Sequence, residues 1–291
     1  MRLAEAGCPA TRHLGPVPGT GPRSTLRHGP LGRRGTAWWL VPLLALGAFV
    51  GLPAVPAAAA SGASYVQGSA FTTSSRVASK TVSFTSAVGA GDLLVGWFAQ
   101  YNLAGQVQVS DNVNGAWTRA PAATTFNSGT GDIALYYVAS SGAASAGGLT
   151  ATVTASGAAY FQGVVGEYSG VAASSPLDQV ASGRGVGLAV TTPATPAVVA
   201  GELIFSGLVT GGSPGSVTAG ATGGVGYTVR AKTSSGSSFS QDVLAGAAGG
   251  QSGTPTLATS TDWYAIAAVF RPATTGAVSY THLTLPTSDL V

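Results

Sequence analysis

Between Ser61 and Ala273 the sequence contains neither cysteine nor histidine. The chain has one cysteine and three histidines, and all four lie outside that segment. The segment therefore cannot form a disulfide, a Ser-His-Asp triad, a Cys-His pair or a zinc site with His and Cys ligands. The chemistry that remains open to it depends on carboxylates, basic side chains and hydroxyls.

Charged residues are also scarce, since Asp, Glu, Lys and Arg make up 8% of the chain. The formal net charge is +3, but six of the basic residues lie before residue 35. From residue 61 to residue 273, seven basic residues stand against eight acids, which leaves −1. We expect no nucleic-acid partner, because binding to phosphates needs a basic surface. The eight acids are Asp92, Asp111, Asp132, Glu167, Asp178, Glu202, Asp242 and Asp262.

An apolar run at residues 38–55 follows Arg33 and Arg34 and precedes four alanines at 57–60. This order of positive, apolar and small residues is typical of a secretory signal peptide. A transmembrane anchor is the alternative, but prolines at positions 42, 53 and 56 favour cleavage. We expect residues 1–60 to be leader and signal peptide. The mature protein is then secreted and extracellular, with no stable membrane span.

The C-terminal end has a different character from the rest of the chain. Residues 278–287 read VSYTHLTLPT, which resembles the translation of a common sequencing adapter. We therefore expect residues 274–291 to be a non-native or disordered tail. On this interpretation the natural sequence beyond about residue 277 is not represented.

The body of the chain, residues 61–273, is rich in Gly, Ala, Ser, Thr and Val and shows no sustained helical period. Short runs of β-branched and aromatic residues recur instead, bounded by Gly, Ser, Asn or Pro. Many short strands between turn signals predict an all-β protein, specifically an antiparallel β-sandwich that is jelly-roll-like. The expected strands are 81–84, 92–98, 107–110, 133–138, 149–155, 160–168, 202–209, 227–231, 241–245 and 263–270.

Four sequence features recur in the same order about 110 residues apart. The repetition predicts two internally similar halves, about 65–175 and 176–273. Length alone leaves open whether the halves form one sandwich or two tandem domains. The features are 91–94 with 201–204, 115–119 with 226–230, 132–135 with 242–245, and 161–168 with 263–270.

Asp111, Asn112 and Asn114 precede Gly115 in a pattern that resembles the start of a calcium loop. Oxygen ligands at alternate positions suit a hard cation. No bidentate Glu follows at the expected distance, and Asn-Gly is a strong hairpin signal. The alternatives are a hairpin turn and a weak calcium site at these three residues. No other cofactor is expected.

Asp92 and Glu202 occupy matching positions at the start of apolar strands. Two carboxyl groups roughly 5 to 9.5 Å apart perform acid–base chemistry in glycoside hydrolysis. A repeated position more naturally has a structural role, such as bonding turn amides or pairing with Arg119 and Arg230. Glu167 differs from the other acids because its counterpart in the second half is Val269.

Exposed aromatic side chains are typical of sugar-binding surfaces. Adjacent aromatic residues on one strand point to opposite faces, so we expect one residue of each pair at 136–137, 160–161 and 263–264 to face outward. Core packing is the alternative for most aromatic residues. The candidate ligand-binding residues are Trp97, Tyr101, Trp117, Tyr137, Tyr160, Trp263 and Tyr264.

Residues 91–95, 111–118, 167–170 and 175–178 make the body of the chain resemble a group of poorly characterised secreted bacterial β-sandwich modules. The resemblance concerns the fold and carries no catalytic residues. It implies a non-enzymatic module for adhesion or for contact with a polysaccharide or cell-surface glycan. Two alternatives stand beside it: a carbohydrate-active enzyme that uses paired carboxylates, and an inert structural surface protein. The oligomeric state stays open.

Overall fold

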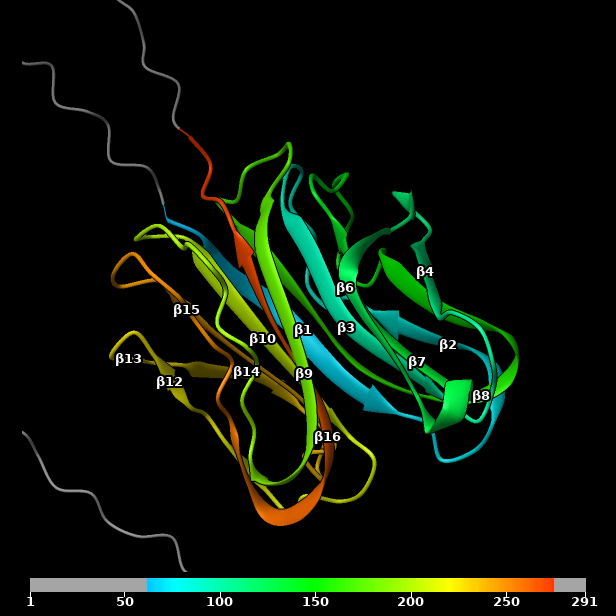
Figure 1. The fold of residues 1–291 in the computed structure, drawn as a ribbon. Helices are drawn as coiled ribbons and strands as arrows, with labels where there is room; N and C mark the ends of the chain where they lie inside the picture. The colour runs from blue at the N-terminus through cyan, green and yellow to red at the C-terminus, as the bar shows by residue number, and fades with distance from the viewer. Residues whose placement is uncertain (1–61, 275–291) are drawn as a thin grey trace, which may run out of the picture. The chain divides into compact units, whose positions relative to one another are not determined.

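Sixteen β-strands and one short 3-10 helix form the regular structure of residues 62–274, which are the residues that the computed structural model describes (Figure 1). Every strand pair is antiparallel, so the expectation of an all-β protein with antiparallel sheets is confirmed. Within this range no helix has the length and apolar character needed to cross a membrane. The expected signal peptide and the tail after residue 274 lie outside the described residues.

The first sheet is built from residues 64–169. Its strands are β1 (Ser64–Thr72), β2 (Val77–Ser83), β3 (Leu93–Tyr101), β4 (Gln108–Asp111), β5 (Gly115–Ala116), β6 (Thr118–Phe126), β7 (Gly131–Val138) and β8 (Thr150–Ser169), with the 3-10 helix η1 (Asn127–Gly129) between β6 and β7.

The second sheet is built from residues 177–270, and a separate two-stranded ribbon lies within the same stretch of sequence. The sheet contains β9 (Leu177–Ala189), β10 (Leu203–Thr210), β11 (Val217–Thr218), β14 (Thr228–Lys232), β15 (Ser238–Leu244) and β16 (Thr256–Phe270), and the ribbon pairs β12 (Ala221–Thr222) with β13 (Val225–Gly226).

The long strand β8 makes the first sheet curl. Its second part pairs with β1 on one side and β3 on the other. Its first part pairs instead with β2 and β4. One strand thus serves two groups of neighbours, and the sheet bends into a half-barrel, whereas the second sheet is flat (Figure 1).

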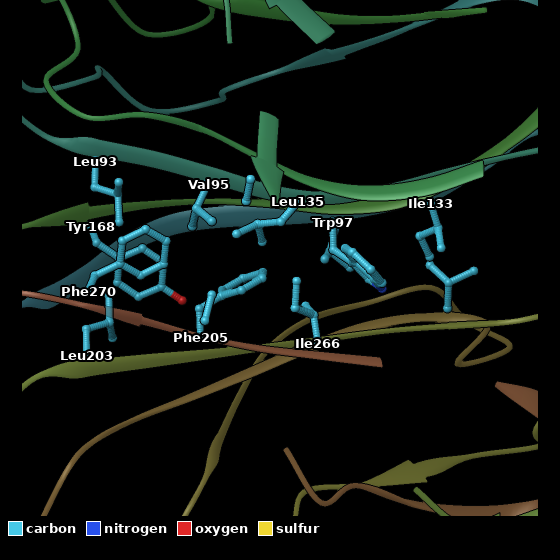
Figure 2. Close-up of a cluster of buried hydrophobic side chains, with 14 of the residues drawn as sticks. Leu93, Val95, Trp97, Ile133, Leu135, Tyr168, Leu203, Phe205, Ile266 and Phe270 are labelled. Atoms are coloured by element: carbon cyan, nitrogen blue, oxygen red, sulfur yellow. The ribbon is translucent and has the colours of Figure 1, made fainter. Parts of the chain in front are cut away.

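The two sheets face each other across a shared hydrophobic core. Side chains on a strand alternate between its two faces, so Leu93, Val95 and Trp97 of β3 point toward the second sheet. Figure 2 shows them opposite residues such as Phe205 and Ile266 of that sheet. Residues from both halves of the sequence are therefore buried together.

The opposite faces of the sheets are also covered. Leu94 and Phe98 of β3 enter a second core on the concave side of the curled sheet. On the second sheet, Leu208 and Ile204 of β10 enter two smaller clusters on its outer face. Strands β3 and β10 are thus buried on both faces, which explains why their sequences are nearly continuous apolar runs.

Candidate functional site

The structure places most of the candidate aromatic residues in the hydrophobic cores. Trp97, Trp117, Trp263 and Tyr264 are at most 8% exposed, and the hydroxyl of Tyr101 is buried. The expectation that one residue of the 263–264 pair faces outward is wrong. Tyr264 enters the core between the sheets, and Trp263 enters the cluster on the outer face of the second sheet.

Tyr137 and Tyr160 are half-buried. Tyr137 packs against the core between the sheets, with its ring 6.1 Å from that of Phe270. The seven candidates come from both faces of two sheets, so the structure does not bring them together as one exposed surface.

Asp111 organises a hairpin turn between β4 and β5. Its Oδ1 accepts the backbone N–H groups of Val113 and Asn114 at 2.7 and 2.6 Å. Its Oδ2 accepts Nδ2 of Asn114 and Nε1 of Trp117 at 2.9 and 2.7 Å. The exposed Asn112 turns away and bonds the backbone of Gly148. A cation at Asp111 would have to displace these four donors, so the arrangement favours the hairpin alternative.

Across the described residues, no three His, Cys, Asp or Glu side chains gather in a way that suits a metal ion.

Two matching ion pairs connect neighbouring strands. Arg119 on β6 binds Asp132 on β7 at 2.9 Å, and Arg230 on β14 binds Asp242 on β15 at 2.8 Å. Asp92 and Glu202 were possible partners of these arginines from their repeated positions, and that suggestion is wrong. Each acid reaches its arginine from an offset position on the neighbouring strand, since Asp132 pairs with Thr125 and Asp242 pairs with Thr228.

Glu202 has the structural role that its sequence position favoured, that of bonding a turn amide. Its carboxylate accepts the backbone N–H of Val199 at 2.7 Å and so closes the turn that leads into β10.

Asp92 contacts a different acid, Glu167 on β8. Glu167 is completely buried, and its two oxygens accept Nε2 of Gln67 at 2.6 Å and the N–H of Gly89 at 2.9 Å. Burial, a hydrogen bond to Glu167 and the charge of Glu167 raise the pKa of Asp92 to about 6.

A cavity of about 380 Å³ lies where β1 meets β13, β14 and β15. Its polar groups are the ion pair of Arg230 and Asp242 and the hydroxyls of Ser64 and Thr228, and Leu244 adds apolar surface. Leu244 is 41% exposed, which is unusual for a leucine in this protein. The cavity therefore combines a few polar groups with an apolar wall, as ligand sites do.

Arg230 is held in this cavity on two sides. Its Nε donates to both carboxylate oxygens of Asp242 at 2.8 Å, and its guanidinium carbon lies 4.6 Å from the centre of the Tyr65 ring. Burial raises the pKa of Asp242, and the guanidinium opposes that rise. Among residues 62–274, no acceptor receives the Nη1 or Nη2 groups of Arg230, whose side chain is 29% exposed.

The sequence analysis noted Arg230 as the counterpart of Arg119 but assigned no binding role to it. Tyr65 was not recognised, because no local pattern places the first strand beside the fourteenth.

Comparison with known protein families, with curated proteins and with solved structures finds no match to this chain.

Proposed function

We propose that the protein is a secreted, non-enzymatic β-sandwich module that contacts a polysaccharide or cell-surface glycan through the cavity beside Arg230. The observation that carries the proposal is the held guanidinium, whose Nη1 and Nη2 groups have no hydrogen-bond partner among the described residues. Two neighbouring N–H groups match a pair of sugar hydroxyls or a sugar carboxylate. Because Tyr65 and Asp242 fix the side chain, little rotamer entropy is lost on binding.

The rest of the cavity suits the same kind of ligand. The exposed Val225 and Leu244 supply apolar surface for the C–H faces of a sugar ring. The hydroxyls of Ser64 and Thr228 add groups that both donate and accept hydrogen bonds. The lining contains one carboxylate, Asp242, which is already bound by Arg230, whereas glycoside hydrolysis uses two. Contact without catalysis therefore fits the cavity better than hydrolysis does.

We further propose that the two halves, 65–175 and 176–273, are related repeats that combine into a jelly-roll-like sandwich. The strand order β1-β8-β3-β7-β6 has a parallel in the order β9-β16-β10-β15-β14, which supports this proposal. The turns before β3 and β10 also agree. Gly91 N–H donates to the Ser141 carbonyl at 2.8 Å, and Gly201 N–H donates to the Ala245 carbonyl at 2.8 Å.

The glycan proposal is tested by retention of the purified protein on a glycan array and on insoluble polysaccharides, with and without calcium. The variant is Arg230→Lys, which keeps a positive charge for Asp242 but loses the planar group that stacks and donates in pairs. The control is Arg119→Lys, the same change in the matching ion pair of the first half.

We expect the wild type and Arg119→Lys to be retained on the same glycan class and Arg230→Lys to bind about tenfold or more weakly, the effect of losing roughly 1.4 kcal/mol. Equal loss in both variants would contradict a role for this cavity. No retention of the wild type across the panel would favour the inert structural alternative.

A further inference from the structure

The contact between Asp92 and Glu167 places two acids together without a basic partner. No Lys or Arg among residues 62–274 forms an ion pair with either carboxyl group. We propose that these two residues, whose carboxyl groups both lie against Gly89, form a proton-operated latch, which fastens the connection 84–91 to the first sheet while Asp92 is protonated and releases it when Asp92 ionises.

The segments packed around Asp92 and Glu167 present neutral side chains to them. The connections 84–91 and 139–149 contain no titratable residue. Strand β1 presents the neutral Gln67, and β3 presents Leu94 directly opposite Glu167. Tyr168, the next residue on β8, points to the other face of the sheet, into the core that Figure 2 shows.

Glu167 holds the connection at two points. One oxygen accepts the N–H of Gly89, and the other accepts Nε2 of Gln67. Gln67 in turn accepts the N–H of Ser86 at 2.9 Å and donates to the carbonyl of Ser86 at 3.1 Å. The carboxyl of Asp92 lies against Gly89, where an added Cβ would be 2.5 Å from its Oδ2. A change at the acid pair therefore acts directly on residues 86–89.

The second half of the chain holds its corresponding turn without a second acid. Glu202 accepts the N–H of Val199 at 2.7 Å, and Val269 occupies the position that corresponds to Glu167. A turn of this kind does not need two carboxyl groups. The additional acid gives the first half a dependence on protons that the second half lacks.

Asp92 keeps its proton at mildly acidic pH. Burial and the neighbouring Glu167 raise the pKa of Asp92 to about 6. Above that pH Asp92 carries a negative charge beside the buried Glu167, in a site that water screens incompletely, and this charge disfavours the contact. The hydrogen bonds to Gly89 and Gln67 then compete with this effect.

The test is amide hydrogen exchange of the full chain between pH 5 and pH 7.5, corrected for the intrinsic pH dependence of exchange. For peptides that cover residues 84–92 we expect protection to fall about tenfold as the pH rises through 6. The full rise in the pKa of Asp92 corresponds to roughly 100-fold in protection. We expect a smaller effect because Asp92 is only half-buried and solvent partly screens its charge.

Asp92→Asn provides the matched variant, because its amide can donate to Glu167 at every pH. We expect the protection of residues 84–92 in this variant to stay within about twofold across the pH range. Glu202→Gln is the control in the second half. It should show the same fall in protection at residues 84–92 as the wild type. If Asp92→Asn does not fold, Asp92→Ala serves the same purpose by removing the charge of Asp92 while both oxygens of Glu167 keep their donors. A wild-type protection that stays constant through pH 6, or a fall in Asp92→Asn or Asp92→Ala as large as that of the wild type, would overturn the proposal. Neither outcome depends on glycan contact.

Discussion

Trp97 connects the two sheets, and its replacement by alanine should destabilise both halves together. The indole is 1% exposed, packs against Gly207 of the second sheet and donates its Nε1 proton to the carbonyl of Tyr264 at 3.2 Å. A side chain of this size buries about 150–250 Å², worth roughly 4–6 kcal/mol at 25 cal/mol per Å². Measured Trp→Ala changes in cores cost about 3–5 kcal/mol, so we expect Trp97→Ala to lose that amount.

The assay is urea unfolding followed by far-UV circular dichroism and by amide exchange resolved along the chain. Peptides from β3 and β10 should lose protection at the same urea concentration, and this midpoint should fall equally for both peptides in Trp97→Ala. The control is Trp117→Ala, in which the lost indole belongs to the core on the concave side of the first sheet. The account is refuted if Trp97→Ala lowers the midpoint of β3 and leaves that of β10 at its wild-type value, because the halves would then fold independently.

Three further changes test the packing, the hairpin and the acid pair. Gly207→Val should cost about 1–3 kcal/mol in denaturant unfolding, because its Cβ would lie 2.8 Å from that of Trp97, and Trp97→Ala should relieve part of this cost. Additive losses in the double variant would argue against the contact. Asp111→Ala should lower the melting temperature, because it leaves the N–H of Val113 and the buried Nε1–H of Trp117 unpaired, which costs about 1–3 kcal/mol of stability. EDTA should leave the melting temperature of the wild type unchanged. A fall in wild-type melting temperature on chelation would instead favour the calcium alternative. Asp92 has a folded pKa of about 6 against an ordinary value of 3.8, so its proton stabilises the fold fully below pH 4 and this contribution is lost as the pH rises through 6. The free energy of unfolding should fall over that range in the wild type and stay flatter in Asp92→Asn; parallel curves would contradict the assignment.

The strands that the sequence predicted are those with an apolar pattern. The expected strands at 92–98, 133–138 and 202–209 match β3, β7 and β10 to within a few residues. Their side chains enter a core on at least one face, and burial requires the pattern that the sequence shows.

Strand β9 was missed because it has little of that pattern. Its sequence LDQVASGRGVGLA is rich in Gly and Ser, and its residues are half-buried or exposed. Pairing with β16 along nearly its whole length defines the strand, and such pairing depends on a partner about 80 residues away. Local propensity therefore gave no signal for it.

The contacts of the candidate site could be predicted only in part. Arg119 and Arg230 were recognised as a repeated feature, but their partners are fixed by strand register, which the sequence leaves open. The contact of Asp92 with Glu167 has the same origin, since it follows from the pairing of Leu94 with Glu167 across β3 and β8. The aromatic residues were misjudged because both faces of each sheet are covered, whereas an alternating strand is commonly solvated on one face.

The measurement that tests the proposed function most directly is retention of the wild type, Arg230→Lys and Arg119→Lys on one panel of soluble and insoluble glycans. We expect the wild type and Arg119→Lys to bind one glycan class alike and Arg230→Lys to bind it about tenfold or more weakly. Equal binding of Arg230→Lys and the wild type would show that the cavity beside Arg230 is not the contact. That result would contradict the proposal that the protein contacts a glycan through this cavity.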